Sequence, residues 1–323
     1  MTVETDTLTT GEERPGRIDA VPVRHPGRWV AVAVVAVIAA LLANLVITNP
    51  AFNWSFVFQA MIQSPVLHGL VMGTILGTVF SMIFGVVLGV VLAIMRLSQN
   101  PVLKAAAFVY TWFFRAVPRL VLLTIMGTLG ILWPHGLGLG VPETFAGWFG
   151  ATNAQLSFAS IDANSLFSGL FGGVVGLGLT EAAYMAEISR AGILSVDAGQ
   201  SEAASALGMS RGLTMRRVVL PQAMRVIVPP TGNETIAMVK DTSLLIGVPV
   251  GAEMFFQLQA IGSRTFQTFP VEVAAVIWYL IIGTVLMILQ AQLERRFGKG
   301  FGALGTGEKG GLARMLTFRG GMH

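Results

Sequence analysis

One polar segment of the sequence carries residues suited to holding another protein rather than to catalysis. A glutamate and two alanines are followed by three residues and a glycine, and after nine more residues by Val-Val-Leu-Pro. Alanines keep a helix face thin enough to enter a groove, and the carboxylate supplies a charge that can anchor the face there. The residues that we expect to make this contact are Gln200, Glu202, Ala203, Ala204, Gly208, Leu220 and Pro221.

The local sequence predicts that this segment folds as two short helices joined by a turn. Asp197 can cap the first helix, and Gly208 is suited to end it because glycine adopts positive φ angles at little cost. Ser210 can cap a second helix, Arg211–Leu220, after which Pro221 should interrupt the chain. An elbow of this kind, seated in a partner's groove, can pass a rigid-body movement to the rest of the chain. The alternative is an ordinary amphipathic connection.

Several ionisable side chains fall inside apolar stretches, where a charge is costly and usually faces a cavity or a partner. Glu181 can meet the cation of a bound ligand, or it can form an ion pair with Arg115, Arg119 or Lys240. Both alternatives stay open from the sequence alone.

Lys240 and Asp241 are followed by two hydroxyl residues. These four residues can line a path for the carboxylate and amino groups of a ligand, or the first two can form a pair that braces a broken helix. Glu187 and Arg190 are three residues apart, a spacing that predicts a simple ion pair on one helix face. The residues that we expect along a ligand path are Arg115, Glu181, Tyr184, Lys240, Asp241, Thr242 and Ser243.

The stretches that hold these residues are apolar enough to cross a membrane. Of the 323 residues, 54% are hydrophobic and 12% are charged, whereas about a quarter are charged in a soluble domain. About 20 apolar residues cross the hydrocarbon core as a helix. Pro249 should break the fifth of the six predicted spans. The spans are Trp29–Ile47, Leu67–Met95, Ala105–Leu132, Leu166–Ile188, Thr235–Gln257 and Val271–Gln292.

Small residues recur at every fourth position of the second span, which places them on one helix face. They predict close packing against another helix, because packing replaces the hydrophobic driving force in lipid. The fourth span begins a similar row with Gly172, Gly176 and Thr180. The first row consists of Gly69, Gly73, Gly77, Ser81, Gly85 and Gly89.

The distribution of lysine and arginine predicts which side of the membrane each connection faces. Basic residues precede the first span, lie in the second-to-third and fourth-to-fifth connections and follow the sixth span, whereas residues 49–66 and 133–165 contain none. Both termini and the polar segment are therefore expected on the cytoplasmic side. Residues 133–165 are expected to form an irregular external loop with room for a short surface helix. The glycine-rich basic tail from Gly298 is expected to be disordered or to touch anionic lipid.

The sequence lacks the residues that most catalytic and metal sites need. It has no cysteine, its four histidines are scattered, and no G-x-x-x-x-G-K-[ST] or H-E-x-x-H motif occurs. We therefore expect no catalytic residue, no metal and no cofactor in this chain. Because the basic residues are explained by membrane orientation, the net charge of +4 gives no reason to expect a nucleic acid partner.

The polar segment and its flanks resemble the permease subunits of ABC importers, whose EAA loop has the spacing EAA, three residues, G, nine residues and I-x-LP. Residues 183–200 fit the pattern AY-x-AE-I-x-R-x-GI…GQ, and residues 220–244 fit LPQA-x-R…PP-x-GN…KDTSL. Over about residues 65–298 the chain is similar to the polar amino acid branch of that family, which includes glutamine, glutamate and histidine systems. Shorter matches are Arg96-Leu97-Ser98, Phe114-Arg115 with Pro118, and Leu293-Glu294-Arg295-Arg296.

The resemblance implies an all-α integral membrane protein, with the five-helix core of type I ABC importers and one extra N-terminal transmembrane helix. It divides the chain into a cytoplasmic tail (1–28), the extra helix with an external loop (29–65), a transmembrane domain (66–296) that contains the EAA loop (197–221), and a cytoplasmic tail (297–323). The implied role is a pathway for polar amino acids through the bacterial inner membrane. The implied partners are two ATPase subunits that bind ATP and Mg²⁺, a second permease subunit (identical or homologous), an extracytoplasmic binding protein and the lipid bilayer.

Two positions depart from the family pattern. Arg119 follows Ala-Val-Pro where the family more often has Gly-Thr-Pro and an apolar residue, and Glu181 stands where small or neutral polar residues are usual. Two other classes of protein remain as alternatives. A secondary amino acid carrier would need no cytoplasmic docking loop, and a membrane-embedded enzyme would need more convergent catalytic groups than this sequence offers.

Overall fold

The computed structural model describes residues 26–132, 137–140, 147–148, 150, 157–162, 167, 169–248 and 250–297. The expectations for Pro249, for most of the N-terminal tail and for the tail from Gly298 therefore lie outside the described residues. The chain divides into two compact units, Met1–Phe52 and Asn53–His323.

The first unit contains, in its described part, the helix α1 (Pro26–Thr48) and the 3-10 helix η1 (Pro50–Phe52). α1 coincides with the first predicted span and is long enough to cross a membrane, with a mean hydropathy of 2.9 in its most apolar window. Apolar side chains cover every face of α1, which is the pattern of a helix surrounded by lipid rather than of one at a boundary between core and water.

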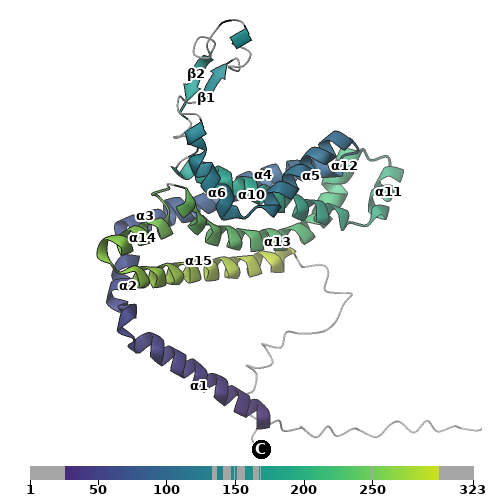
Figure 1. Cartoon of the computed structure of the whole chain (residues 1–323). Helices are drawn as coiled ribbons and strands as arrows, with labels where there is room; N and C mark the ends of the chain where they lie inside the picture. The colour runs from purple at the N-terminus through teal and green to yellow at the C-terminus, as the bar shows by residue number, and fades with distance from the viewer. Residues whose placement is uncertain are drawn as a thin grey trace, which may run out of the picture. The chain divides into compact units, whose positions relative to one another are not determined.

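The second unit is a bundle of helices with one small hairpin (Figure 1). Three of its helical stretches, Ser64–Leu97, Gly169–Leu194 and Thr268–Arg296, are long and apolar enough to span a membrane and agree with the second, fourth and sixth predicted spans. In chain order the elements are α2 (Trp54–Met61), α3 (Ser64–Gly69), the π-helix η2 (Leu70–Leu76), α4 (Gly77–Leu97), α5 (Pro101–Ala116), α6 (Arg119–Thr128), the 3-10 helix η3 (Leu129–Leu132), β1 (Leu137–Gly140), β2 (Ser157–Ile161), α10 (Gly169–Leu194), α11 (Ala198–Ala206), α12 (Arg211–Thr214), the π-helix η4 (Met215–Val219), α13 (Leu220–Asp241), the 3-10 helix η5 (Thr242–Gly247), α14 (Met254–Thr265) and α15 (Thr268–Phe297).

The span predicted over Ala105–Leu132 is broken, because the helical stretches Pro101–Ala116 and Arg119–Leu132 are bent by 100° relative to each other. The break follows from Pro118, since a proline disfavours helical angles at the residue before it. Val117 is accordingly extended, with φ −90° and ψ 132°. The bend makes Arg119 the first residue of α6, and its side chain is only 13% exposed.

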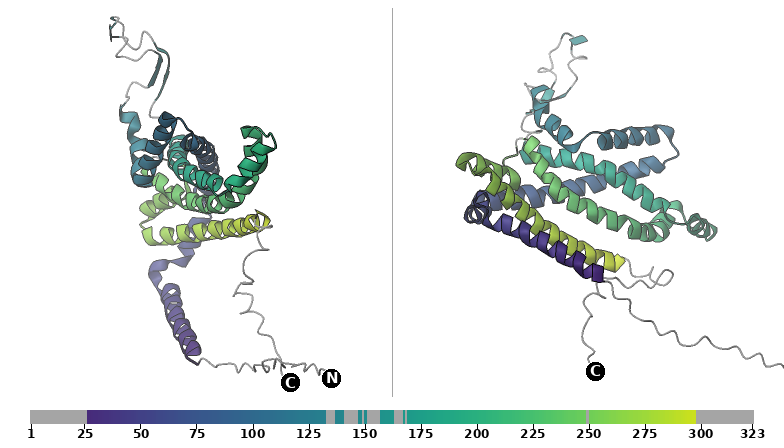
Figure 2. Two further views of the ribbon diagram at one scale, coloured as in Figure 1. Left: turned by 90° about the vertical axis from the view of Figure 1, so that its right-hand side faces the viewer. Right: turned by 60° about the horizontal axis from the view of Figure 1, so that its bottom comes forward.

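The predicted fifth span, Thr235–Gln257, is also wrong. α12, η4 and α13 form one continuous helical stretch that ends at Asp241, and η5 and α14 follow as separate short helices. The bounds predicted from hydropathy were wrong because α13 carries prolines and charged residues, which lower its hydropathy. The apolar residues that follow do not continue the helix, and Leu245 and Val248 are instead fully buried in the core. Figure 2 shows α13 between α10 and α15.

The row of small residues on the second span packs closely against two different partners, as predicted. Gly85 faces α10, where an added Cβ would lie 2.7 Å from the Cγ of Glu181. Gly73 faces the segment before α14, where an added Cβ would lie 2.2 Å from the carbonyl oxygen of Ala252. Large side chains at these positions would therefore separate α4 from α10 and η2 from the start of α14.

The loop expected at residues 133–165 contains two short strands in its described part. β1 and β2 pair in antiparallel register, with Leu137 opposite Ile161. Figure 1 shows α11 and α12 at one end of the helix bundle and α14 at the other. The EAA loop therefore lies at the end of the bundle opposite α14.

Candidate functional site: the EAA loop and an intramembrane charge cluster

The first half of the EAA loop folds as predicted. The carboxylate of Asp197 caps α11 by accepting a hydrogen bond from the backbone N–H two residues later, at 2.7 Å. Gly208 follows with φ +75°. The N–H groups of Gly208 and Met209 donate to the carbonyls of Ser205 and Ala204 at 3.0 and 3.1 Å. These two bonds and the positive φ form a Schellman motif, which ends α11 with its last carbonyls satisfied.

The second half of the loop differs from the prediction. Ser210 occupies the cap position of α12, but its hydroxyl makes no capping hydrogen bond. Pro221 does not interrupt the chain, since it lies in the first turn of α13 immediately after η4. A proline ring clashes with the carbonyl four residues earlier in a regular helix, and the wider π-helical turn relieves that clash. The loop is therefore joined without a break to the helix that enters the bundle.

The exposed surface of the loop combines charge, alanine and one large apolar side chain. Leu207 is 82% exposed and offers an apolar side chain at this surface. Ala204 is buried, at 4% exposure, on the inner side of α11. The other predicted contact residues are exposed, namely Gln200, Glu202, Ala203, Gly208, Leu220 and Pro221.

A cluster of ionisable side chains lies inside the bundle around Arg119. Its guanidinium is 3.0 Å from Oε2 of Glu181 on α10 and 3.7 Å from Oε2 of Glu234 on α13, and it forms a further ion pair with Asp241. The side chain of Glu181 is fully buried. Of the cations named for an ion pair with Glu181, the structure shows Arg119 as its partner. We call these four residues the charge cluster.

Tyr184 extends the charge cluster along α10. Its ring centre lies 4.7 Å from the guanidinium carbon of Arg119 and 5.7 Å from that of Arg115, both within the range of cation–π contacts. Arg115 lines an open pocket of about 460 Å³ together with Tyr184 and Glu187. The predicted ion pair between Glu187 and Arg190 is also present, because Arg190 donates to Oε2 of Glu187 at 2.8 and 2.9 Å.

Of the two alternatives for Lys240 and Asp241, the pair that braces a broken helix is not formed, since Asp241 pairs with Arg119 and Lys240 is exposed. Successive residues of a helix point in different directions and cannot face each other. The hydroxyls of Thr242 and Ser243 donate to backbone carbonyls three residues earlier, at 2.8 and 2.7 Å, and so close the end of α13. The structure thus groups Arg115, Glu181, Tyr184 and Asp241, and it places Lys240 and the hydroxyls elsewhere.

Two acidic residues were missed by the sequence reasoning. Glu234 lies seven residues before Asp241, a spacing of two helical turns that places both on one face and could have revealed it. Glu253 is buried at the start of α14, where its Oε1 accepts from Thr74 at 2.9 Å and from Tyr279 at 3.2 Å. Glu253 falls inside the predicted fifth span, which the structure does not form. Glu253 ties η2, α14 and α15 together.

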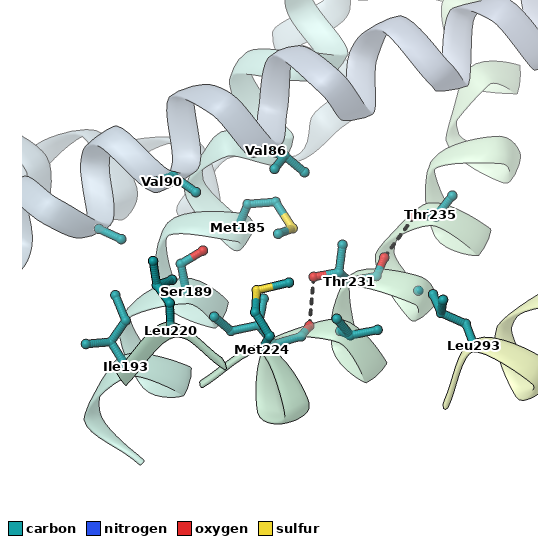
Figure 3. A pocket seen from close by; sticks show the side chains of 14 residues that line it. Val86, Val90, Met185, Ser189, Ile193, Leu220, Met224, Thr231, Thr235 and Leu293 are labelled. Carbon is teal, nitrogen blue, oxygen red and sulfur yellow. Dashed lines mark hydrogen bonds between the residues drawn. The ribbon is translucent and has the colours of Figure 1, made fainter. Parts of the chain in front are cut away.

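A cavity of about 300 Å³ lies between α4, α10 and α13 and is lined almost entirely by apolar side chains such as Val86, Met185 and Ile227 (Figure 3). The hydroxyls of Thr231 and Thr235 donate to carbonyls of their own helix, at 2.8 and 2.9 Å. Since its lining is mostly apolar and the hydroxyls of Thr231 and Thr235 are already engaged, this cavity is poorly suited to bind a polar ligand, and the charge cluster is the better candidate.

Comparison with known proteins gives consistent matches. A family profile described as "Binding-protein-dependent transport system inner membrane component" matches residues 85–299. The chain is 44% identical over 288 residues to the Arginine transport system permease protein ArgU of Corynebacterium glutamicum, covering 89% of this chain and 85% of that protein. It is 44% identical over 123 residues to the Glutamine transport system permease protein GlnP of Escherichia coli K12, covering 38% of this chain and 56% of that protein.

Solved structures show the same fold. A chain from the crystal structure of an amino acid ABC transporter with histidines matches with a TM-score of 0.54 and 30% identity, covering 72% of this chain and 94% of that chain. A chain of the inward-facing MetNI methionine ABC transporter matches with a TM-score of 0.52 and 18% identity, covering 73% and 97% of the two chains. At 18% identity the second match shows a shared fold alone.

Proposed function

Because the chain belongs to the family of inner-membrane components of binding-protein-dependent transport systems, we propose that it forms the membrane pathway of an ATP-driven importer of polar amino acids. The names of two relatives, which state arginine and glutamine, support this class of substrate. A secondary carrier is not favoured, since the relatives and the structural neighbours are parts of binding-protein-dependent or ABC transporters. Membership of this family assigns the chain a transport role and no catalytic one.

The observation that carries this proposal is the rigid junction between the exposed EAA loop and α13. Gly208 closes α11, and the next helix begins at Arg211 and continues to Asp241. A partner that holds α11 therefore holds the turn that leads directly into a continuous helix, whose other end lies in the charge cluster. In the proposed assembly two ATPase subunits, which bind ATP and Mg²⁺, each hold the EAA loop of one of two permease subunits, identical or homologous.

The surface of the EAA loop supports docking into a groove. Leu207 offers an apolar side chain, Ala203 keeps the neighbouring face thin, and Glu202 supplies a charge at the rim. The proposed side of the membrane is cytoplasmic, where ATP is available, and both chain termini are proposed to lie there too. The support is the distribution of lysine and arginine, which favours the cytoplasmic side.

The proposed substrate path passes Arg115, Tyr184 and the charge cluster. Arg115 has no ion pair with any described residue, so its guanidinium is suited to receive the α-carboxylate of an amino acid. Lys240 is exposed beside a second polar pocket, and we propose that it faces the path between the two permease subunits. Thr242 and Ser243 have less support, because their hydroxyls are already bonded to the backbone. An extracytoplasmic binding protein would deliver substrate at the end of the bundle that carries α14.

The proposed mechanism is a rigid-body switch between two states. Closure of the ATPase subunits moves the EAA loops, and each loop carries its continuous helix with it. Because Glu234 and Asp241 lie on that helix while Arg119 lies on α6, this movement changes the contacts of the charge cluster. Hydrolysis then returns the subunits to the starting state.

Cross-linking tests the proposed docking directly, because the chain has no cysteine of its own. In the complex isolated with its ATPase, an Ala203→Cys variant should cross-link to lysines of the ATPase through a reagent that carries one maleimide and one N-hydroxysuccinimide ester. A Ser263→Cys variant, at an exposed position of α14, is the matched control and should not cross-link. In intact cells a membrane-impermeant maleimide should label only the control. Labelling of both positions from outside, or no link from Ala203→Cys, would contradict the proposal.

A further inference from the structure

The two residues at which the chain departs from the family pattern contact each other. Arg119, the first residue of α6, lies 3.0 Å from Glu181, in the middle of α10. Either charge alone would be expensive in the interior of a membrane protein, because it would lack a partner of opposite sign. Their pairing explains why both can occur, but it does not explain the other two carboxylates beside them.

The charge cluster contains more acidic groups than basic groups. Arg119 also pairs with Asp241 and lies 3.7 Å from Glu234, so one guanidinium faces three carboxylates. These carboxylates form no ion pair with any other described cation. Lys240 is exposed on another face of α13, and Arg115 lies over the ring of Tyr184. The site therefore favours a second cation.

Glu181 shows where this cation can bind. Its side chain is fully buried, and Oε2 receives the hydrogen bond from Arg119. The other carboxylate oxygen, Oε1, has no hydrogen-bond partner among the described residues. A buried carboxylate oxygen without a donor is costly, and a donor from a ligand would remove that cost.

We propose that Glu181, Glu234 and Asp241 bind the side-chain cation of a basic amino acid during transport, and that Arg119 occupies this site when no substrate is present. The inference rests on the proposed function, since it names the substrate class of the same pathway. A guanidinium presents a planar set of five N–H donors, and the contacts of Arg119 show that this site accepts that group. The ring of Tyr184 adds a face against which a planar cation can stack.

Exchange between Arg119 and substrate would also connect binding to movement. Glu234 and Asp241 lie on α13, which is continuous with the helix that leaves the EAA loop. While Arg119 holds these carboxylates, α13 is tied to α6. A substrate cation that takes over the carboxylates releases this tie, so the loaded site favours the state in which α13 can move.

Equilibrium binding to the permease–ATPase complex without its binding protein tests the site, because the binding protein adds its own selection. The probes are radiolabelled arginine and citrulline, which have nearly the same shape but differ in charge at the end of the side chain. Arginine should bind at least tenfold more tightly than citrulline. The Glu181→Gln variant should lose at least tenfold in arginine affinity and keep its citrulline affinity.

Two further variants separate binding from folding. Glu234→Gln leaves the Arg119–Glu181 pair in place and should lower arginine affinity even if Glu181→Gln does not assemble. Arg119→Gln removes the competing guanidinium and should tighten arginine binding, an effect that a purely structural ion pair would not produce. Glu272→Gln, at an exposed carboxylate of α15 outside the cluster, is the matched control and should change nothing.

The outcomes distinguish this inference from the proposed function. Equal affinity for arginine and citrulline, or unchanged arginine affinity in both glutamate variants, would overturn the cation site. If the complete importer still takes up any amino acid with ATP in proteoliposomes, the proposed function stands even then. If the complete importer takes up no amino acid, the proposed function itself is wrong.

Discussion

The backbone of Gly85 on α4 lies directly against the side chain of Glu181 on α10. A Cβ added at Gly85 would fall 2.7 Å from Cγ and 2.8 Å from Cβ of Glu181. The row of small residues and the buried acid are therefore parts of one contact, in which a glycine on one helix makes the room that a carboxylate on the next helix needs to reach Arg119.

Gly85→Ala should destabilise the protein, because the new methyl group overlaps with Glu181 and both helices must shift. Overpacking of this kind costs about 1–3 kcal/mol, which should lower the Tm of the purified protein by several degrees. Gly283→Ala is the matched control, since Gly283 on α15 has no other atom within 4 Å of its missing Cβ. Equal Tm values for the two variants would show that the contact is not tight in solution.

Arg119→Ala should be strongly destabilising, since it leaves the carboxylates of Glu181, Asp241 and Glu234 without their cation. Loss of one partner of a buried ion pair costs about 3–5 kcal/mol. The double variant Arg119→Ala/Glu181→Ala should lose less than the sum of the two single losses, because it removes both members of the pair. Measurement of Tm for the full cycle checks this, with exposed Arg216→Ala as the neutral reference. Additive losses would mean that the two residues do not interact.

Gly208→Asp should abolish ATP-driven uptake while the membrane subunit stays folded. No atom outside the local backbone lies within 4 Å of the missing Cβ, so the turn has room for a side chain. The new charge, however, projects from the exposed surface that we propose to face the ATPase. Gly208→Asn is the matched control, because Asn tolerates a positive φ angle and adds no charge. Uptake in proteoliposomes and co-purification of the ATPase measure the effect, and wild-type uptake by the Asp variant would refute this role of the loop.

Glu253→Ala should loosen the end of the bundle that carries α14. The change removes the carboxylate that caps α14 through the N–H of Phe256, at 3.0 Å, and it leaves the hydroxyls of Thr74 and Tyr279 without their acceptor. Loss of a helix cap costs about 1 kcal/mol, and each buried donor left unpaired adds about 1–3 kcal/mol. Hydrogen exchange should therefore rise in α14 and η2 but not in α11, whereas the exposed Glu272→Ala should leave all three unchanged. An equal rise of hydrogen exchange in α11, α14 and η2 of the Glu253 variant would show that Glu253 does not stabilise this end of the bundle locally.

The family and the all-α membrane fold were predictable from the sequence, and the family profile and solved neighbours confirm both. The cap at Asp197 and the positive φ at Gly208 were predictable as well, because each depends on the residue itself and a few neighbours. A local turn of this kind is decided by short-range backbone preferences, which the amino acid sequence states directly.

The course of the helices was less predictable, because prolines act differently according to their surroundings. Pro118 bends the chain, whereas Pro229 and Pro230 lie inside α13 without ending it. Side chains add bonds to the α13 backbone around these prolines, since Thr231 donates to the carbonyl of Ile227 at 2.8 Å and Gln290 donates to that of Pro229 at 3.4 Å. The second of these donors comes from α15, so no local pattern could have identified it.

The charge cluster was predictable in its residue types but not in its pairing. An acid inside a span needs a cation, and Arg119 was one of three candidates. Only the bend at Pro118, which turns α6 back onto the bundle, selects it. Glu234 could have been added from its spacing to Asp241, once α13 was known to be one helix.

The continuous helix that begins at Arg211 has a consequence for its depth in the bilayer. At about 1.5 Å per residue it is roughly 45 Å long, and its last residue, Asp241, shares Arg119 with the midpoint of α10. Half of the hydrocarbon thickness is only about 15 Å. When such a helix runs along the membrane normal from the midplane, its first turns lie among the lipid phosphates or beyond them, a depth that suits the exposed guanidinium groups of Arg211, Arg216 and Arg217.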